Sequence, residues 1–282
     1  MASLIQPLTT SNHDRERAGL RYVYPVVSRR ADGVSIGINL NPNNACNWAC
    51  IYCQVPNLSR GGPPPLDMQL LEVELNSMLD DVQHGDFMQT QVPPEARRLM
   101  DVAFSGNGEP TSAPDFAEAV AVVSRILRAR GLAEIRLRLI SNGSLVQRPY
   151  VQDGLRLLAE ANGEAWFKVD AIEPERVLLL NGVHQTPAAT LARLKLCASL
   201  VPTWVQTCMM AVDGQAPTES EVGRYLDFLA EVRTEIAGVL MYGLARESMQ
   251  SGAERLSPLS SDWMEAMGAR IAALGLPVRV NP

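Results

Sequence analysis

The sequence predicts an α/β fold built around a parallel sheet. Six short segments typical of strands alternate strictly with six segments of helical periodicity. Such alternation requires crossover helices between parallel strands, so the loops that leave the carboxyl ends of the strands meet at one rim. The chain has 282 residues, of which 46% are hydrophobic and 20% charged. It can therefore bury a sizeable core, and no internal repeat or low-complexity tract marks a second domain.

Short apolar or alternating runs define the expected strands. The first, at 35–40, alternates between apolar residues and small or polar ones. Five more are expected at 102–104, 135–140, 165–170, 204–211 and 237–242, with 278–280 as a candidate for a short terminal strand. Residues 1–24 are polar and lack clear periodicity, so we expect a partly ordered lead-in there, followed by a single core domain over 25–282.

Apolar residues at helical spacing, together with capping signals, define the expected helices between these strands. Gly131 is suited to stop the second helix. Thr218 and Glu221 have the spacing of a capping box at the start of the fifth. The expected helices cover 68–82, 112–130, 149–161, 186–198, 218–232 and 262–274.

Three of the five cysteines lie within eight residues, directly after the first expected strand. Cys46, Cys50 and Cys53 are spaced Cys-x3-Cys-x2-Cys, and thiolates are natural ligands of iron–sulfur clusters. Three ligands leave one iron of a four-iron cluster open to a small molecule. A long chain with few cysteines disfavours a disulfide framework. A structural zinc site would need a fourth ligand, and neither Cys197 nor Cys208 brings the usual second pair.

This cysteine spacing resembles the signature of the radical S-adenosylmethionine (radical SAM) superfamily. The resemblance implies a six-unit partial barrel, open at one side, with a [4Fe–4S] cluster on Cys46, Cys50 and Cys53. It implies that S-adenosylmethionine (SAM) binds the open iron and that Tyr52 lies near the adenine. It further implies an enzyme that takes an electron from a flavodoxin- or ferredoxin-type donor. The reaction implied is cleavage of SAM to methionine and a 5′-deoxyadenosyl radical, which abstracts hydrogen from a substrate.

The loop after the second expected strand resembles the Gly-Gly-Glu loop of this superfamily, which receives the ammonium group of SAM. Glycine lets the backbone approach closely, and a carboxylate suits an ammonium. The sequence departs from the family pattern by placing Asn107 between the two glycines, and an ordinary turn is the alternative. The residues implied at this position are Gly106, Gly108, Glu109 and Pro110.

Two further stretches resemble SAM-binding positions of the superfamily. Ser141 and Asn142 follow the third expected strand, where the family holds the ribose or carboxylate of SAM, although a plain turn would also explain them. Tyr242 and Gly243 end the sixth expected strand, in a stretch that loosely resembles the one giving backbone contacts to adenine. A buried strand flanked by glycines explains that stretch nearly as well.

Strand alternation places Lys168 and Asp170 on the face of the fourth strand that points into the barrel, because Phe167 and Val169 form an apolar opposite face. Buried charges need a partner or a task. The two side chains are therefore either a structural ion pair or candidate catalytic residues that bind substrate or SAM.

Residues 25–55, which include the cysteines and the segment just before them, resemble the corresponding part of a group of enzymes. This group includes the wyosine-synthesising tRNA enzymes and their uncharacterised bacterial relatives. This chain lacks the further cysteines that those enzymes carry before the signature. Its net charge of −6 and pI of about 5.2 have the wrong sign for a dedicated nucleic-acid binder. Arg29, Arg30 and Arg60 flank the cysteines and could hold a phosphate or carboxylate.

These observations favour a small-molecule or peptide substrate over tRNA. Two alternatives stay open: a tRNA-modifying enzyme of the wyosine type, and a non-catalytic iron–sulfur or zinc-binding protein. No signal peptide and no apolar run of membrane-spanning length occur in the sequence, so we expect a cytoplasmic protein without a membrane partner.

Overall fold

A computed structural model describes residue 8, residues 19–28 and residues 33–282. Its main sheet has eight strands, and all neighbours are parallel except the first pair. From one edge to the other the strands are β1 (Val23–Ser28), β2 (Gly33–Ile38), β5 (Leu99–Phe104), β6 (Arg136–Ser141), β7 (Glu164–Lys168), β8 (Thr203–Cys208), β10 (Gly238–Tyr242) and β12 (Val278–Asn281). The six expected strands and the terminal strand are therefore confirmed.

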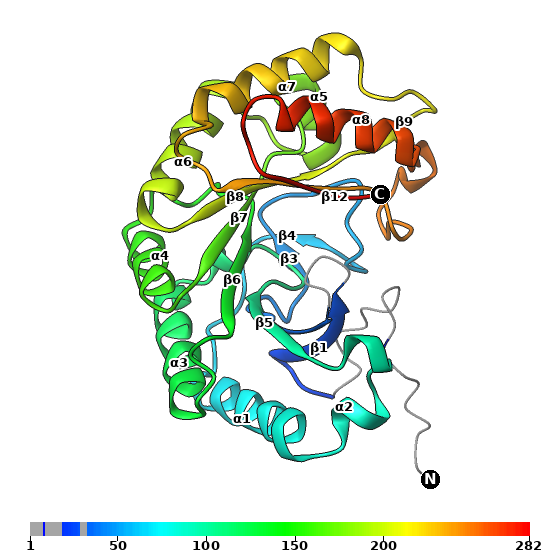
Figure 1. Cartoon of the computed structure of the whole chain (residues 1–282). Coiled ribbons are helices and arrows are strands. Elements are labelled where there is room, and N and C mark those ends of the chain that lie inside the picture. The colour runs from blue at the N-terminus through cyan, green and yellow to red at the C-terminus, as the bar shows by residue number, and fades with distance from the viewer. Residues whose placement is uncertain (1–7, 9–18, 29–32) are drawn as a thin grey trace.

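Six crossover helices lie on the outer side of this sheet, which curls into a partial barrel (Figure 1). The predicted fold class is confirmed, and the helices lie between the strands as expected. They are α1 (Met68–His84), α3 (Phe116–Ala129), α4 (Pro149–Glu160), α6 (Pro187–Leu200), α7 (Glu219–Val232) and α8 (Ser261–Ala272). Two shorter helices were not expected, namely α2 (Phe87–Thr90) and α5 (Pro174–Asn181).

Some expected boundaries were wrong. The second helix begins at Phe116 rather than near 112, because Pro110–Ser112 forms a separate 3₁₀ turn. The fifth strand ends at Cys208 rather than at 211. Beyond it, β9 (Ala211–Val212) pairs with β11 (Leu256–Ser257) in a small ladder of its own.

The main core lies between the sheet and the helices. Phe167 and Val169 are buried in it, as the alternation of the fourth strand predicted. The rings of Phe104 and Phe116 meet edge to face, with 5.8 Å between their centroids. The expected capping box at the start of α7 is formed.

The strand β1 was not expected, since its apolar run is interrupted by Pro25. It pairs antiparallel with β2 at the sheet edge, where proline is tolerated. The buried carboxylate of Glu74 on α1 accepts the backbone amides of Tyr22 (2.7 Å) and Val23 (3.2 Å). These bonds fix where the strand begins. Most of the expected lead-in, 1–24, lies outside the described residues.

On the concave side, the short strands β3 (Ala45–Cys46) and β4 (Ser59–Arg60) carry the chain into and out of the cysteine loop (Figure 1). Within the described part of the chain, no helix is both long and apolar enough to cross a membrane.

Candidate functional site

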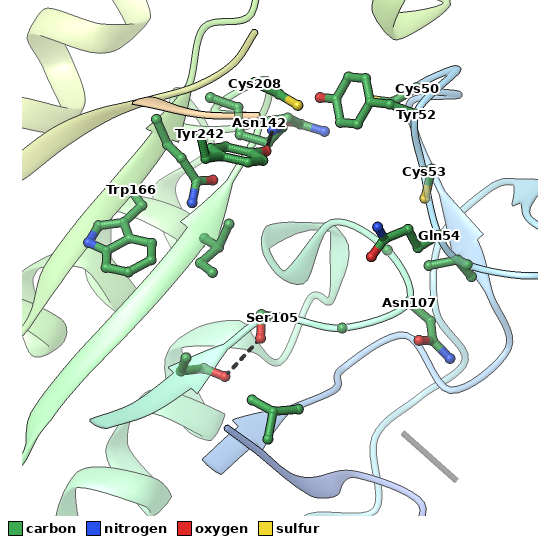
Figure 2. A pocket seen from close by; sticks show the side chains of 18 of the residues that line it. Cys50, Tyr52, Cys53, Gln54, Ser105, Asn107, Asn142, Trp166, Cys208 and Tyr242 are labelled. Atoms are coloured by element: carbon green, nitrogen blue, oxygen red, sulfur yellow. Dashed lines mark hydrogen bonds between the residues drawn. The ribbon is translucent and has the colours of Figure 1, made fainter. Parts of the chain in front are cut away.

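A cavity of about 300 Å³ lies against the inner face of the sheet. Figure 2 shows Cys50, Tyr52 and Cys53 on one side of it and Trp166 of β7 on the other. Cys46 lines the same cavity. The three cysteines predicted as cluster ligands therefore border one space, together with the inner face of the sheet.

Backbone hydrogen bonds hold the cysteine loop, residues 46–53, against the end of α5. The amides of Ala49 and Ile51 donate to the carbonyl oxygens of Asn181 (3.0 Å) and Leu180 (2.9 Å). Because these partners lie far away in the sequence, the loop takes its shape from the fold rather than from its own local preferences.

The loop that follows β10 covers the cysteine loop from another side. Ser248 Oγ donates to the carbonyl oxygens of Ile51 (2.6 Å) and Cys53 (3.1 Å) in a shared hydrogen bond. Gln250 Nε2 donates to those of Cys53 (3.2 Å) and Val55 (2.7 Å). The side chains of Ser248 and Gln250 thus satisfy carbonyl groups in and just after the cysteine loop, near Cys50 and Cys53.

Arg60 binds within the chain. Its guanidinium donates to the carbonyl oxygens of Asn47 (2.6 Å) and Gly182, which joins the cysteine loop to the loop after α5. This arginine therefore braces the cysteine loop. Arg29 and Arg30 lie outside the described residues.

Two sulfur atoms of the cysteine loop face N–H donors of the chain. The Trp48 amide lies 3.4 Å from Cys46 Sγ, and Asn181 Nδ2 lies 3.4 Å from Cys50 Sγ. Burial raises the pKa of the Cys46 thiol to about 12 and that of the Cys50 thiol to about 11. Binding of a metal by either sulfur therefore requires release of its proton.

Three soft sulfur donors around one cavity fit an iron–sulfur cluster, whose irons take thiolate ligands. Among the described residues, no three His, Cys, Asp or Glu side chains converge as the ligands of a single metal ion would. A cluster of several irons separates its ligands more widely than one ion does. The three cysteines therefore fit an iron–sulfur cluster because their thiols share a cavity, and not because they form a site for a single ion.

The loop after β5 lies beside the cysteine loop. A side chain at Gly108 would collide with the carbonyl oxygen of Ala45, and Gly106 has a φ of +148° that favours glycine. Asn107, the departure from the family pattern, donates from Nδ2 to Asn44 Oδ1 at 2.6 Å. The asparagine thus ties this loop to the residues just before the cysteines.

The carboxylate of Glu109 is buried and joins the loops after β5 and β6. Its Oε1 accepts from the Thr111 amide (3.1 Å), the Thr111 hydroxyl (2.6 Å) and the Ser141 hydroxyl (2.7 Å), while Oε2 accepts the Asn142 amide (2.7 Å). Burial raises the pKa of Glu109, although these donors oppose the rise. A carboxylate has about four lone-pair sites, so the chain itself fills most of the acceptor capacity of Glu109.

Most residues predicted to bind SAM line the cavity. Pro110 and Ser141 do not line it, because the proline starts the 3₁₀ turn and the serine hydroxyl points to Glu109. Asn142 lines the cavity and donates from Nδ2 to Asn47 Oδ1 at 2.8 Å. The predicted residues on the cavity wall are Tyr52, Gly106, Gly108, Glu109, Asn142, Tyr242 and Gly243.

Lys168 and Asp170 belong to a buried group at the carboxyl end of β7, which we call the rim cluster. Lys168 Nζ donates to Tyr242 Oη (2.9 Å) and to Asp170 Oδ1 (3.4 Å). Asp170 Oδ2 accepts from Tyr52 Oη and from Asn181 Nδ2, the latter at 2.9 Å. Burial lowers the pKa of Lys168, but the negative charges of Asp170 and of the Tyr242, Cys208 and Cys50 side chains together outweigh it, so the pKa is raised. Lys168 lines the cavity, whereas Asp170 lines a separate, smaller pocket.

A second charged group lies at the amino end of the same strand, and we call it the floor cluster. Arg138 donates from Nε to Glu164 Oε1 at 2.8 Å and from Nη1 to Asp101 Oδ2. Its guanidinium also lies over the Trp166 ring, 4.8 Å from the centroid. Ser35 Oγ completes the cluster by donating to Asp101 Oδ1.

Sequence reasoning missed Asn181, Ser248, Gln250 and the bracing role of Arg60. Each acts on the cysteine loop through a contact between distant parts of the chain, so no spacing in the sequence marks it. The only available signal was the polar character of Asn181 next to an apolar run, which many surface residues share.

Known structures share this fold. SuiB of Streptococcus suis bound to precursor peptide SuiA has a TM-score of 0.58 and 13% identity, over 87% of this chain and 48% of that chain. SuiB bound to S-adenosylmethionine has a TM-score of 0.56 and 12% identity, over 89% and 47%. A radical SAM methyltransferase from Sphaerobacter thermophilus has a TM-score of 0.58 and 12% identity, over 92% and 68%. At these identities the likeness shows the fold alone, and this chain spans about half the length of SuiB.

A curated protein named GTPase Obg, from Brachyspira hyodysenteriae (strain ATCC 49526 / WA1), is 26% identical over 152 residues. These make up 52% of this chain and 19% of that protein. The phosphate-binding loop of nucleotide hydrolases ends in Gly-Lys-Ser/Thr. The two lysines of this sequence, Lys168 and Lys195, follow Phe167 and Leu194, so the chain has no such loop.

The family model of the Radical SAM superfamily matches residues 40–229. The match contains the cysteine loop and the loops after β5 and β6, and it covers more than half of the chain. Taken with the partial barrel and the three cysteines on one cavity, it shows that this chain belongs to the Radical SAM superfamily.

Proposed function

We propose that this protein is an enzyme that binds a [4Fe–4S] cluster through Cys46, Cys50 and Cys53 and cleaves SAM reductively. The observation that carries the proposal is that these cysteines border one cavity with Asn142 and the loop after β5. The substrate proposed is a small molecule or a peptide. In its support, the structure of SuiB, which shares the fold, holds a precursor peptide.

When bound, the cluster and SAM would supply an electron transfer that breaks a bond of SAM and yields a 5′-deoxyadenosyl radical able to take hydrogen from a substrate. The chain would hold and orient these groups. The N–H groups of Trp48 and Asn181 would continue to donate to sulfur, which favours the anionic thiolate. Glu109 would position Asn142 toward SAM, and backbone oxygens of the loop after β5 would receive the SAM ammonium.

Lys168 and Asp170 would act mainly by fixing Tyr52 against the rim of the barrel. The cavity wall would exclude water from the reacting atoms. A flavodoxin- or ferredoxin-type protein is proposed as the electron donor.

The cluster is tested by anaerobic reconstitution. The protein should hold about four iron and four sulfide, and alanine at Cys46, Cys50 or Cys53 should abolish the visible absorbance of the cluster. Cys197→Ala is the matched control, because this buried cysteine lies on α6 outside the cavity. Stoichiometric zinc without sulfide would support a non-catalytic metal protein instead.

SAM binding is tested separately. Asn142→Ala and Glu109→Gln should weaken SAM binding roughly tenfold, which corresponds to about 1.4 kcal/mol, and leave the cluster absorbance intact. Both residues line the cavity outside the cysteine loop. Gln147→Ala is the control, because Gln147 is exposed and lies in the loop after β6, as Asn142 does. Unchanged SAM affinity in both cavity variants would contradict the proposed site.

The wyosine-type alternative makes a different prediction. A tRNA-binding protein neutralises several phosphates, so its affinity falls steeply as salt rises. A gel-shift assay with total tRNA and reconstituted, SAM-bound protein should show no binding near physiological salt. Micromolar, salt-sensitive binding that is lost when Arg29 and Arg30 become alanine would favour the alternative.

A further inference from the structure

Gln206 lies on β8, beside Lys168 in the register of the sheet. Its side chain lines the cavity and the residue is only 1% exposed. Figure 2 shows Trp166, on the neighbouring strand β7, across the cavity from Cys53, while Cys208 lies beside Tyr52. Gln206 therefore belongs to the wall that faces the proposed cluster site.

The side-chain amide of Gln206 has no partner among the described residues. Its Nε2 is buried without a hydrogen bond, and Oε1 accepts none from the described part of the chain. Buried polar groups in proteins are nearly always hydrogen-bonded, and leaving a donor unsatisfied costs stability. The backbone of Gln206 is paired within the sheet, since its carbonyl accepts the Val169 amide at 3.0 Å. Only the side chain is left for another molecule.

Two cationic groups on the same cavity, those of Lys168 and Arg138, are already paired within the chain. The Lys168 ammonium donates to Asp170 and Tyr242, and the Arg138 guanidinium donates to Asp101 and Glu164. A carboxylate on the substrate would accept a hydrogen bond from Gln206 Nε2 but offer nothing to Oε1. A planar amide offers a donor and an acceptor side by side, which matches both ends of the glutamine side chain.

We propose that Gln206 is a specificity-determining residue that pairs with an uncharged amide of the substrate, either a peptide group or a primary carboxamide. This inference rests on the proposed function, because it places the substrate in the cavity that the cysteines share. It narrows the substrate class to molecules that carry an amide close to the reacting carbon.

Thermal stability gives the first test. Gln206→Met keeps the length of the side chain and removes the unsatisfied amide, so it should raise the Tm of the ligand-free protein by about 2–4 °C. Gln250→Met is the matched control, because Gln250 Nε2 donates to two carbonyl oxygens, and this change should lower the Tm. The melts are run with and without the cluster. A Tm that falls in Gln206→Met would mean that the amide has a structural partner and would overturn the proposal.

Ligand binding gives the second test. Acetamide, acetate and acetone have the same number of heavy atoms but differ in their donors and acceptors. Ligand-observed NMR on reconstituted, SAM-bound protein should detect acetamide more strongly than the other two, with binding weakened at least fivefold in Gln206→Met. Equal binding of all three probes, or acetamide binding that is the same in Gln206→Met as in the wild type, would overturn the proposal.

Cluster absorbance and SAM affinity are measured on the same samples. Their absence in the wild-type protein would contradict the proposed function, while the melts without cluster would still show whether the Gln206 amide has a structural partner. A tenfold loss of SAM affinity in Gln206→Met would assign this residue to SAM and refute a role in substrate choice.

Discussion

The rim cluster and the floor cluster use similar chemistry at opposite ends of β7. Each places a largely buried cation between an acid and an aromatic ring, Lys168 at the rim and Arg138 at the floor. They differ in what they connect. At the floor, Ser35 lies opposite Asp101 and Arg138 opposite Glu164 in the register of neighbouring strands. The floor cluster therefore joins strands that the sheet already pairs.

The rim cluster joins the sheet to segments outside it. Tyr52 comes from the cysteine loop and Asn181 from the end of α5, and both donate to Asp170. A buried ion pair is weak evidence for stability on its own, but removing one partner is costly. The comparison suggests that the floor cluster mainly stabilises the sheet and that the rim cluster mainly fixes the proposed cluster-binding loop.

The largest effect is expected at the floor. Arg138→Met would leave Asp101 and Glu164 without their cation, and we expect a loss of about 5 kcal/mol in the free energy of unfolding. Urea unfolding of anaerobically purified protein measures it. The iron content of the protein that remains folded should match the wild type. A loss of iron without a loss of stability would show that the floor cluster, like the rim cluster, acts on the cysteine loop.

An intermediate effect is expected at the rim. Asp170→Asn keeps the size of the side chain but leaves Lys168 without its counter-charge, which we expect to cost about 3 kcal/mol. Because Tyr52 and Asn181 lose a charged acceptor, the reconstituted variant should also hold less iron. Asp213→Asn is the control, since Asp213 pairs with Arg255 at the surface and its loss should change neither property. Full iron content in Asp170→Asn would show that the rim cluster does not fix the loop.

The smallest effect is expected at Ser248. Alanine there removes the hydroxyl that donates to Ile51 and Cys53, at a cost of about 1 kcal/mol. In the reconstituted Ser248→Ala variant, the visible absorbance of the cluster should decay faster in air than in the wild type, because the cysteine loop opens more often. Ser199→Ala, which removes an exposed helix hydroxyl, should decay at the wild-type rate. Equal decay in both variants would argue against a role of the covering loop.

The sequence predicted the parallel core well, because each strand and helix has its own local pattern. It missed β1, where Pro25 interrupts an apolar run that only the sheet edge and Glu74 hold extended. It also missed α5, whose eight residues are too short to show a helical stripe, although Pro174 stands at its first position. Both elements depend on packing against residues distant in the sequence.

The site was predictable only where chemistry is concentrated in one stretch. The cysteines and the glycines after β5 were found by spacing, and the structure places them on one cavity. For Lys168 and Asp170 the sequence left an ion pair and a catalytic role equally open. The structure shows the pair at 3.4 Å within a larger network, and a role toward substrate stays a prediction. No pattern in the sequence showed that the Gln206 side chain lacks a partner, since this is a property of the folded wall.

The contacts of the cysteine loop also bear on how the protein is made. Cys50 meets Asn181 across 131 residues, and Ser248 meets Ile51 across 197. Chains emerge from the ribosome amino end first and fold in that order where they can. Here the cysteines are made early, but the segments that shape their loop follow much later. The loop can reach its final form only after residue 250 has been synthesised, so the proposed cluster would be inserted late in biogenesis.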